Sequence, residues 1–220
     1  MSPPPERVFV VDDDPAMRRS VSRLLRSAGF EALAFGEPEE FLRLVPPDSS
    51  GCVILDVSMP GLDGLAVQRQ LSSRGSHVSI VFLTGHGNIP KSVQAIQSGA
   101  TDFLEKPVED EVLLQAVRRA LTAHTAGRKA REELAEIRRR LATLTRRERE
   151  VMEGVVTGRL NKQVAADLGI SETTVKIHRG RVMRKMKAGS LAGLVRFADR
   201  LRETEEPPQS TRPSKSRSST

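Results

Sequence analysis

The sequence predicts two units of different fold class, an α/β unit built on a five-stranded parallel sheet and a small all-α unit of four helices. Apolar runs alternate with amphipathic stretches through residues 6–121, whereas residues 140–202 contain amphipathic stretches alone. Strands that alternate with helices are typical of a parallel sheet covered on both faces. A chain of 220 residues suits this division, because domains commonly hold about 100 to 200 residues.

Five short apolar runs predict the strands of the first unit: 8–11, 31–35, 52–56, 78–84 and 101–105. Apolar side chains recur at helical spacing between these runs and predict five helices, within 15–30, 39–45, 64–74, 89–99 and 109–121. Gly29 and Gly99 are expected at the C-terminal caps of the first and fourth helices. In such sheets the ligand site lies at the carboxyl ends of the strands.

Residues 122–139 are highly charged and predict a helical linker between the units. Apolar residues across and just beyond it repeat with spacings of 4, 3, 4 and 3: Ala130, Leu134, Ile137, Leu141 and Leu144. This seam has two interpretations, pairing of two protomers as in a coiled coil, or contact with a neighbouring domain of the same chain. Residues 203–220 are rich in Pro and Ser and predict a disordered tail.

The charge is divided unevenly along the chain. Residues 1–120 hold 12 Lys and Arg against 16 Asp and Glu, whereas residues 121–220 hold 23 against 12. The total of +7 is therefore an average of −4 and +11, and only the second half is expected to bind a polyanion. A single cysteine, Cys52, excludes an internal disulfide, and no apolar run reaches 18 residues. We expect a cytoplasmic protein without a membrane partner, in which Cys52 is a buried thiol.

Polar residues follow four predicted strands of the first unit at their carboxyl ends: Asp12, Asp13, Asp14, Asp56, Thr84 and Lys106. Carboxylates that meet at one sheet edge repel one another unless a cation lies among them, and Mg²⁺ prefers such oxygen ligands. A lysine and a hydroxyl can stabilise a transferring phosphoryl group, and a remaining carboxylate can act as its nucleophile. The pattern predicts a magnesium-dependent phosphoryl site.

Single aspartates at strand ends also have a simpler interpretation. Asp14, which precedes Pro15, and Asp63 are each expected to cap the N-terminus of a helix. A different class of protein, a hydrolase of the acid-phosphatase kind, would use Asp12 as nucleophile and Asp14 as general acid. The immediate Pro15 disfavours this alternative, because the helix begins where that class continues its loop.

Four blocks in order, VVDDDP, LDVSMPGLDG, LTGHG and GATDFLEKP, resemble the signature of bacterial response-regulator receiver domains over residues 6–121. The resemblance implies a flavodoxin-like fold with strand order 2-1-3-4-5. It implies that Asp56 accepts the phosphoryl group and that Asp12, Asp13, Asp56 and the backbone carbonyl of Ser58 hold Mg²⁺. It further implies that Lys106 binds the phosphoryl oxygens, and that Thr84 and Phe103 form the switch. Ser58 and His86 occupy positions that tune the lifetime of the phosphate in this family.

The second unit shows clear helix boundaries. Thr145 and Glu148 form a capping box, Gly169 closes a short helix, and Ser171 can cap a longer one that reaches about Met186. A short helix, a turn containing Gly and a longer basic helix are typical of a helix-turn-helix, whose cations neutralise DNA phosphates. Two alternatives are a merely solvated basic face and an adaptor that binds protein or RNA.

Three segments, LTRREREV, GRLNKQVAADLGIS and TVKIHRGRVMRKM, resemble the LuxR-type DNA-binding domain. From this resemblance we expect the following DNA contacts: Asn161, Lys162, Ser171, Thr174, Lys176, Ile177, Arg179, Gly180 and Arg184. Gly180 stands where some relatives carry a longer side chain, so a target sequence cannot be transferred. A fourth helix near 190–202 would supply a dimer contact through its apolar residues: Leu191, Leu194, Val195 and Ala198.

Together the two resemblances indicate the NarL/FixJ class of response regulators. The class implies a transcription regulator that a sensor histidine kinase phosphorylates, and that then forms a homodimer on two-fold half-sites of promoter DNA. RNA polymerase is a further partner that the class implies. We expect no enzymatic activity other than the self-catalysed, Mg²⁺-dependent phosphoryl transfer to Asp56.

Overall fold

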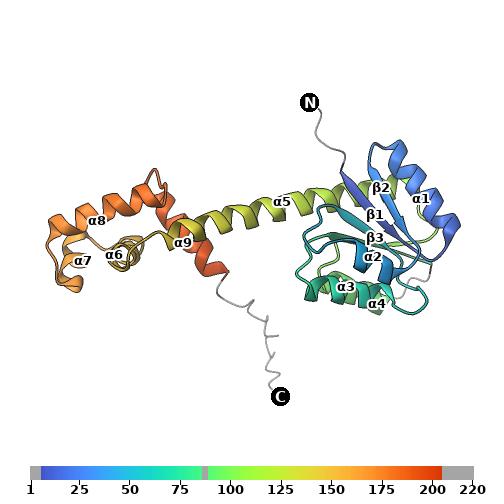
Figure 1. Ribbon diagram of the computed structural model, residues 1–220, viewed down its shortest axis with the longest axis horizontal. Coiled ribbons are helices and arrows are strands. Elements are labelled where there is room, and N and C mark those ends of the chain that lie inside the picture. The colour runs from blue at the N-terminus through green and yellow to red at the C-terminus, as the bar shows by residue number, and fades with distance from the viewer. Residues whose placement is uncertain (1–5, 86–88, 205–220) are drawn as a thin grey trace, which may run out of the picture. The chain divides into compact units, whose positions relative to one another are not determined.

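The computed structural model describes residues 6–85 and 89–204 and divides the chain into two compact units between Lys129 and Ala130 (Figure 1). In the described part of the first unit the strands are β1 Arg7–Val11, β2 Glu31–Phe35, β3 Cys52–Leu55, β4 Ser79–Thr84 and β5 Asp102–Glu105. Each neighbouring pair is parallel and the order is β2-β1-β3-β4-β5, so the predicted flavodoxin-like topology is confirmed.

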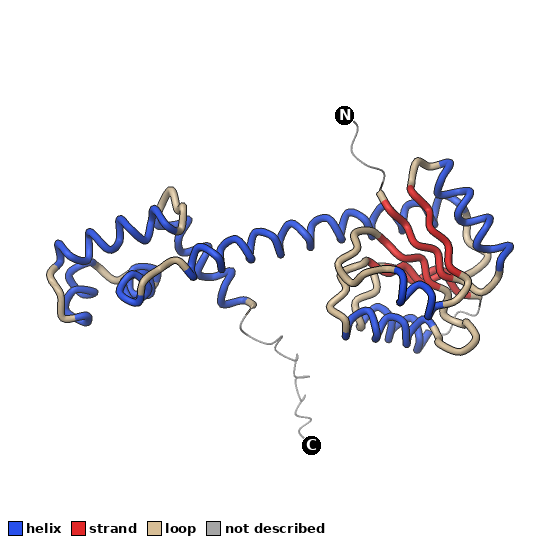
Figure 2. Tube along the Cα trace, viewed as in Figure 1, coloured by secondary structure: helices blue, strands red, loops and turns tan. Residues whose placement is uncertain are grey.

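Helices cover both faces of this sheet, as Figure 2 shows. They are α1 Pro15–Ser27, α2 Pro38–Leu44, α3 Gly64–Ser73, α4 Ile89–Gln97 and α5 Asp110–Ala142. Successive side chains of β1 point to opposite faces: Val8 and Val10 pack in the core with α1 and α5, whereas Phe9 and Val11 pack in the core with α2, α3 and α4. Two apolar layers therefore fix the sheet, and its carboxyl edge is left for polar residues.

Local capping sets the starts of α1 and α3 as predicted. The Asp14 carboxylate accepts a hydrogen bond from the Ala16 N–H, and the Asp63 carboxylate accepts one from the Ala66 N–H. Gly29 follows α1 with a φ of 89°, a left-handed conformation that favours glycine. Asp14 is therefore occupied as a helix cap, which argues against its use as a general acid.

The second unit is helical throughout its described part, with α6 Arg146–Val156, α7 Asn161–Leu168, α8 Glu172–Lys185 and α9 Leu191–Glu203. The predicted capping box of Thr145 and Glu148 is present, and Gly169 closes α7 with a φ of 64°. Helix α8 begins at the Ser171 cap, and its inner face buries Val175, Val182 and Met186.

Helix α5 is longer than the sequence pattern indicated. The helix predicted to end at 121 and the separate linker predicted over 122–139 form one helix that ends at Ala142. No proline interrupts residues 108–142, so nothing in the local chemistry stops the helix. Ile137 and Leu144 are buried in the core of the second unit, with Leu134 and Leu141 packed against it. The seam therefore contacts a domain of its own chain, the second of its two interpretations.

Two further expectations concern residues outside the ranges that the structure describes. The predicted tail falls almost entirely in 205–220, and His86 also lies outside the described residues. Among the described helices, none is both long enough and apolar enough to cross a bilayer.

Candidate functional site

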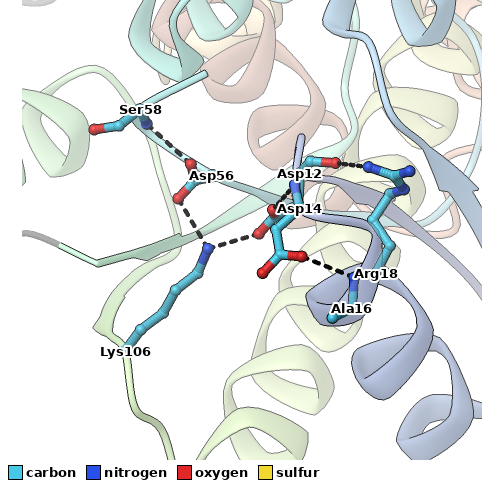
Figure 3. Close-up of polar contacts among 7 residues, drawn as sticks. All are labelled: Asp12, Asp14, Ala16, Arg18, Asp56, Ser58 and Lys106. Atoms are coloured by element: carbon cyan, nitrogen blue, oxygen red, sulfur yellow. Dashed lines mark hydrogen bonds and ion pairs between the residues drawn. The ribbon is translucent and has the colours of Figure 1, made fainter. Parts of the chain in front are cut away.

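Three charged side chains meet at the carboxyl edge of the sheet (Figure 3). Lys106, just after β5, places its Nζ 2.6 Å from Asp12 Oδ2 and 3.2 Å from Asp56 Oδ1. Asp12 follows β1 and Asp56 follows β3, so the parallel strands bring together residues that are up to 94 positions apart. Both carboxylates are buried, and a single ammonium group is shared between them.

Backbone N–H groups hold both carboxylates from the other side. Asp56 Oδ2 accepts a hydrogen bond from the Ser58 N–H at 3.2 Å, and Asp12 Oδ1 accepts one from the Asp14 N–H at 2.8 Å. The Asp56 N–H itself donates to the Val11 carbonyl at 2.9 Å. These bonds fix the direction of each side chain at the sheet edge.

Burial raises the pKa of Asp56, because it removes water from the charged form. The charge of Lys106 and its hydrogen bond oppose this rise, the nearby charge of Asp12 adds to it, and the Ser58 N–H again opposes it. Burial by itself would lower the pKa of Lys106, but its contacts with Asp12 and Asp56 outweigh burial and raise it. The site thus keeps an excess of negative charge that its lysine does not neutralise.

The remaining residues predicted for this site lie on β4 and β5 or in the turns after β1 and β3. Thr84 is fully buried at the end of β4, and its carbonyl accepts the Lys106 N–H at 2.7 Å. Phe103 is partly buried on β5, with its ring 5.9 Å from the ring of Phe82. Asp13 and Ser58 are exposed in the turns after β1 and β3.

The donor set at this edge fits Mg²⁺. The carboxylates of Asp12 and Asp56 are hard oxygen donors, and the single ammonium group between them leaves one negative charge unbalanced. Mg²⁺ typically binds one or two carboxylates together with waters and phosphate oxygens. Among the residues that the structure describes, no group of three or more Asp, Glu, His or Cys side chains is arranged to hold a metal ion. Two carboxylates at this edge suit an ion that takes its remaining ligands from water or phosphate oxygens.

Sequence patterns did not single out Arg18. Its Nη1 donates to the main-chain carbonyl of Asp12 at 2.6 Å, across the first turn of α1 (Figure 3). The sequence did contain a signal for this contact. Side chains in the first turn of a helix lean back toward the helix N-terminus, which here places Arg18 near the end of β1.

Helices α7 and α8, with the Ser171 cap between them, carry the surface predicted to face DNA. The predicted contact residues are exposed or partly exposed in every case: Asn161, Lys162, Ser171, Thr174, Lys176, Ile177, Arg179, Gly180 and Arg184. Ser171 Oγ accepts the Thr174 N–H at 3.1 Å and so fixes the start of the helix. Arg179 Nη1 donates to Asn161 Oδ1 at 3.3 Å, which ties α8 to α7. The arrangement presents a basic, outward-facing helix.

Two of the four residues on α9 that were predicted to make a dimer contact face the core of their own unit. Leu194 and Ala198 are buried in the core of their own unit, so they cannot meet a second chain from that position. Leu191 is 37% exposed and Val195 is partly buried. The prediction mistook part of the core-facing side of an amphipathic helix for an outer surface, because periodicity alone does not say what covers an apolar face.

A buried ion pair in the second unit was also missed. Glu148 is 2% exposed, and its Oε2 lies 2.6 Å from Lys185 Nζ at the end of α8 and 2.8 Å from the Thr145 N–H. Hydrogen bonds from Lys185 and Thr145 lower the pKa of Glu148. Lys185 Nζ also donates to the Thr143 carbonyl at 3.0 Å. This pair fastens the end of the basic helix to the start of α6.

The fold and the acidic edge define a receiver domain, and the second unit defines a helix-turn-helix module. Residues 8–118 match the family model of the response regulator receiver domain, and residues 142–198 match that of bacterial regulatory proteins of the luxR family. The chain belongs to the two-component response regulators that join a receiver to a LuxR-type DNA-binding domain, and it is a phosphorylation-regulated transcription regulator.

Relatives and solved structures span nearly the whole chain. Nodulation protein W of Bradyrhizobium diazoefficiens is 49% identical over 88% of this chain and 86% of its own length. Transcriptional regulatory protein FixJ of Azorhizobium caulinodans is 43% identical over 87% of this chain and 90% of its own. The solved structure of the response regulator StyR is 42% identical, with a TM-score of 0.78, and the match covers 89% of this chain and 99% of StyR. Full-length FixJ from B. japonicum is 42% identical, with a TM-score of 0.56, over 90% and 98% of the two chains.

Proposed function

We propose that Asp56 accepts a phosphoryl group and that its phosphorylation controls the binding of α7 and α8 to promoter DNA. One observation carries the proposal: two buried carboxylates at the carboxyl edge of the sheet share one ammonium group. Such an arrangement costs stability unless further positive charge enters, and catalytic and binding sites accept that cost. The donor is a sensor histidine kinase in the cytoplasm, and a small phosphodonor can replace it.

In the transfer, a carboxylate oxygen of Asp56 attacks phosphorus, one P–O bond forms, and the bond from phosphorus to the donor breaks with its electron pair leaving on the donor. Lys106 Nζ, already within 3.2 Å of Asp56, turns to the phosphoryl oxygens, and the Thr84 hydroxyl offers them a further hydrogen bond. Mg²⁺ held by Asp12, Asp13, Asp56 and the Ser58 carbonyl would neutralise charge on those oxygens.

The new group brings a charge of about −1.5 to −2 to the edge, by analogy with other protein phosphates. Lys106 and Thr84 belong to the ends of neighbouring strands, which a 2.7 Å backbone hydrogen bond already joins. Their shift toward the phosphate moves Phe103 on β5 and favours pairing of two chains. Pairing would place two copies of α8 on half-sites about 34 Å apart.

DNA binding would follow from the exposed basic face of α8. Lys176 and Arg184 neutralise backbone phosphates, and Thr174 and Ile177 near the start of the helix reach base edges. Affinity for duplex DNA should therefore fall steeply as salt rises. Salt-insensitive binding would contradict recognition through DNA phosphates, and the absence of two-fold footprints on genomic fragments would favour the adaptor alternative.

Incubation with acetyl phosphate and Mg²⁺, followed by intact mass measurement, tests the acceptor. Wild-type protein should gain the mass of one phosphoryl group, and alkali should remove it. Asp56→Asn should gain none, while Asp48→Asn, which removes an exposed carboxylate outside the site, should match the wild type. Uptake of alkali-labile phosphate by Asp56→Asn at the wild-type level would refute the assignment.

A further inference from the structure

Asp12 is held at two points by two different cations. Lys106 Nζ contacts its carboxylate at 2.6 Å, and Arg18 Nη1 donates to its main-chain carbonyl, also at 2.6 Å. In Figure 3 the two side chains approach Asp12 from opposite sides. In the proposed reaction Lys106 moves from Asp12 toward the phosphoryl oxygens. Arg18 instead binds a main-chain carbonyl, and this contact can persist throughout the reaction.

The Arg18 guanidinium also covers the turn that follows β2. A Cβ atom added at Gly36 would lie 3.2 Å from each of three guanidinium atoms of Arg18, namely Cζ, Nη1 and Nη2. Three equal distances mean that the flat face of the guanidinium lies over Gly36. The Asp12 N–H donates to the carbonyl of Phe35 at 3.3 Å, so the same two turns are joined a second time. Arg18 thus packs the turn bearing Asp12 against the turn after β2.

When the main chain of an aspartate is fixed, its carboxylate loses little conformational freedom on binding a cation. Partners that orient metal ligands in this way commonly change metal affinity by about 10-fold or more when removed. The contact with Arg18 matters most when Lys106 leaves Asp12, because of the two described hydrogen bonds to the Asp12 carboxylate the one from the Asp14 N–H then remains.

We propose that Arg18 is a positioning residue of the magnesium site: it fixes the main chain of Asp12 so that the carboxylate stays aimed at the cation. The inference rests on the proposed phosphorylation chemistry, but it concerns magnesium binding alone and can be measured without a phosphodonor. The hydrogen bond that the structure gives Arg18 goes to the main chain of Asp12 and not to the carboxylate of Asp56.

Isothermal titration calorimetry of the full chain with MgCl₂ tests the role of Arg18. Arg18→Ala should raise the dissociation constant for Mg²⁺ about 10-fold. Arg18→Lys should recover part of this loss, because an ammonium can reach the carbonyl but has no flat face for Gly36. Arg19→Ala removes the same charge from an exposed neighbour on α1 and should leave the affinity unchanged. Circular dichroism checks that each variant is folded.

Gly36→Ala provides a second route, since it keeps Arg18 in the sequence and displaces its guanidinium. We expect a smaller loss of Mg²⁺ affinity than for Arg18→Ala. In phosphorylation assays both variants should need more Mg²⁺ for half-maximal rate, and the rate at saturating Mg²⁺ should approach that of wild type.

Wild-type Mg²⁺ affinity in Arg18→Ala and Gly36→Ala would overturn the inference, as would an equal loss in Arg18→Ala and Arg19→Ala. Failure of the wild type to take up phosphate would instead refute the proposed function. The two failures are distinguishable, because calorimetry is done without phosphodonor.

Discussion

Each unit of this protein contains a buried carboxylate in contact with a lysine, and the two arrangements behave in opposite ways. In the receiver, Lys106 lies 2.6 Å from Asp12 and 3.2 Å from Asp56, and the pKa of Asp56 is raised. In the DNA-binding unit, Lys185 lies 2.6 Å from Glu148, and the pKa of Glu148 is lowered. Contact with a lysine therefore does not by itself decide whether a buried carboxylate is stable as an anion.

The difference lies first in burial, which raises the pKa of Asp56 more than Lys106 lowers it, and then in the ratio of charges around each carboxylate. Glu148 has an ammonium group to itself together with the Thr145 N–H, so its charge is matched. Asp56 shares one ammonium with Asp12 and lies close to that second negative charge. A matched pair holds two helices together, whereas an unmatched one leaves negative charge that a further cation could balance. On the proposed function, this imbalance is what separates the receiver site from the structural ion pair of the second unit.

The largest effect should follow from breaking the matched pair. Glu148→Ala leaves Lys185 without its carboxylate partner and removes the capping box, and we expect a loss of about 3 kcal/mol of unfolding free energy in the DNA-binding unit. The chain has neither Trp nor Tyr, so unfolding is best followed by circular dichroism, with hydrogen exchange to locate the change. Glu150→Ala, which removes two more exposed ion pairs of the same helix, is the control and should change far less.

Magnesium should act on the unmatched site alone. At a concentration near 100 times its dissociation constant, a cation that binds only the folded state adds about 2.7 kcal/mol of stability. Scanning calorimetry should show that Mg²⁺ raises the unfolding temperature of the receiver and leaves that of the DNA-binding unit unchanged. Equal shifts in both units would point to a general ionic effect and contradict the comparison.

The matched pair should also respond to acid. Because the folded pKa of Glu148 is lowered, its contribution to stability is present above the unfolded value, near 4.3, and is lost as pH falls through the folded value. Glu148→Gln should therefore be less stable than wild type at pH 7, by about 1 to 2 kcal/mol. Urea unfolding at a series of pH values should show this gap closing below about pH 4.3. A gap that is constant with pH would exclude the charge as its cause.

A smaller effect of opposite sign is expected at the receiver site. Asp12→Asn leaves Lys106 paired with Asp56 alone, which relieves the repulsion between two buried carboxylates. Without Mg²⁺ we expect the receiver to gain about 1 kcal/mol of stability. Asp48→Asn serves as the neutral reference in the same unfolding experiment. Destabilisation by Asp12→Asn would mean that the three-residue cluster is itself a structural element.

Features that depend on neighbours in sequence could be predicted, as could those that parallel topology enforces. Asp14 and Asp63 cap helices because their side chains reach backbone N–H groups two or three residues away. Asp12, Asp56 and Lys106 meet because parallel strands end at the same edge.

Features that depend on which surfaces face each other could not be predicted. The packing of Arg18 on Gly36 could be found only once the turns after β1 and β2 were placed side by side. Glu148 was recognised as part of a capping box, but its partner Lys185 lies 37 residues away on another helix. Leu194 was assigned to an outer surface because periodicity identifies an apolar face without identifying its cover.

The central claim is that the unmatched site in the receiver controls the basic helix in the other unit. Its most direct test is the affinity of one preparation for a duplex selected from a random-sequence library, measured at fixed salt before and after treatment with acetyl phosphate and Mg²⁺. Wild-type affinity should rise with the fraction phosphorylated, and that of Asp56→Asn should stay unchanged. An unchanged affinity of fully phosphorylated wild type, or an equal rise in Asp56→Asn, would contradict the claim.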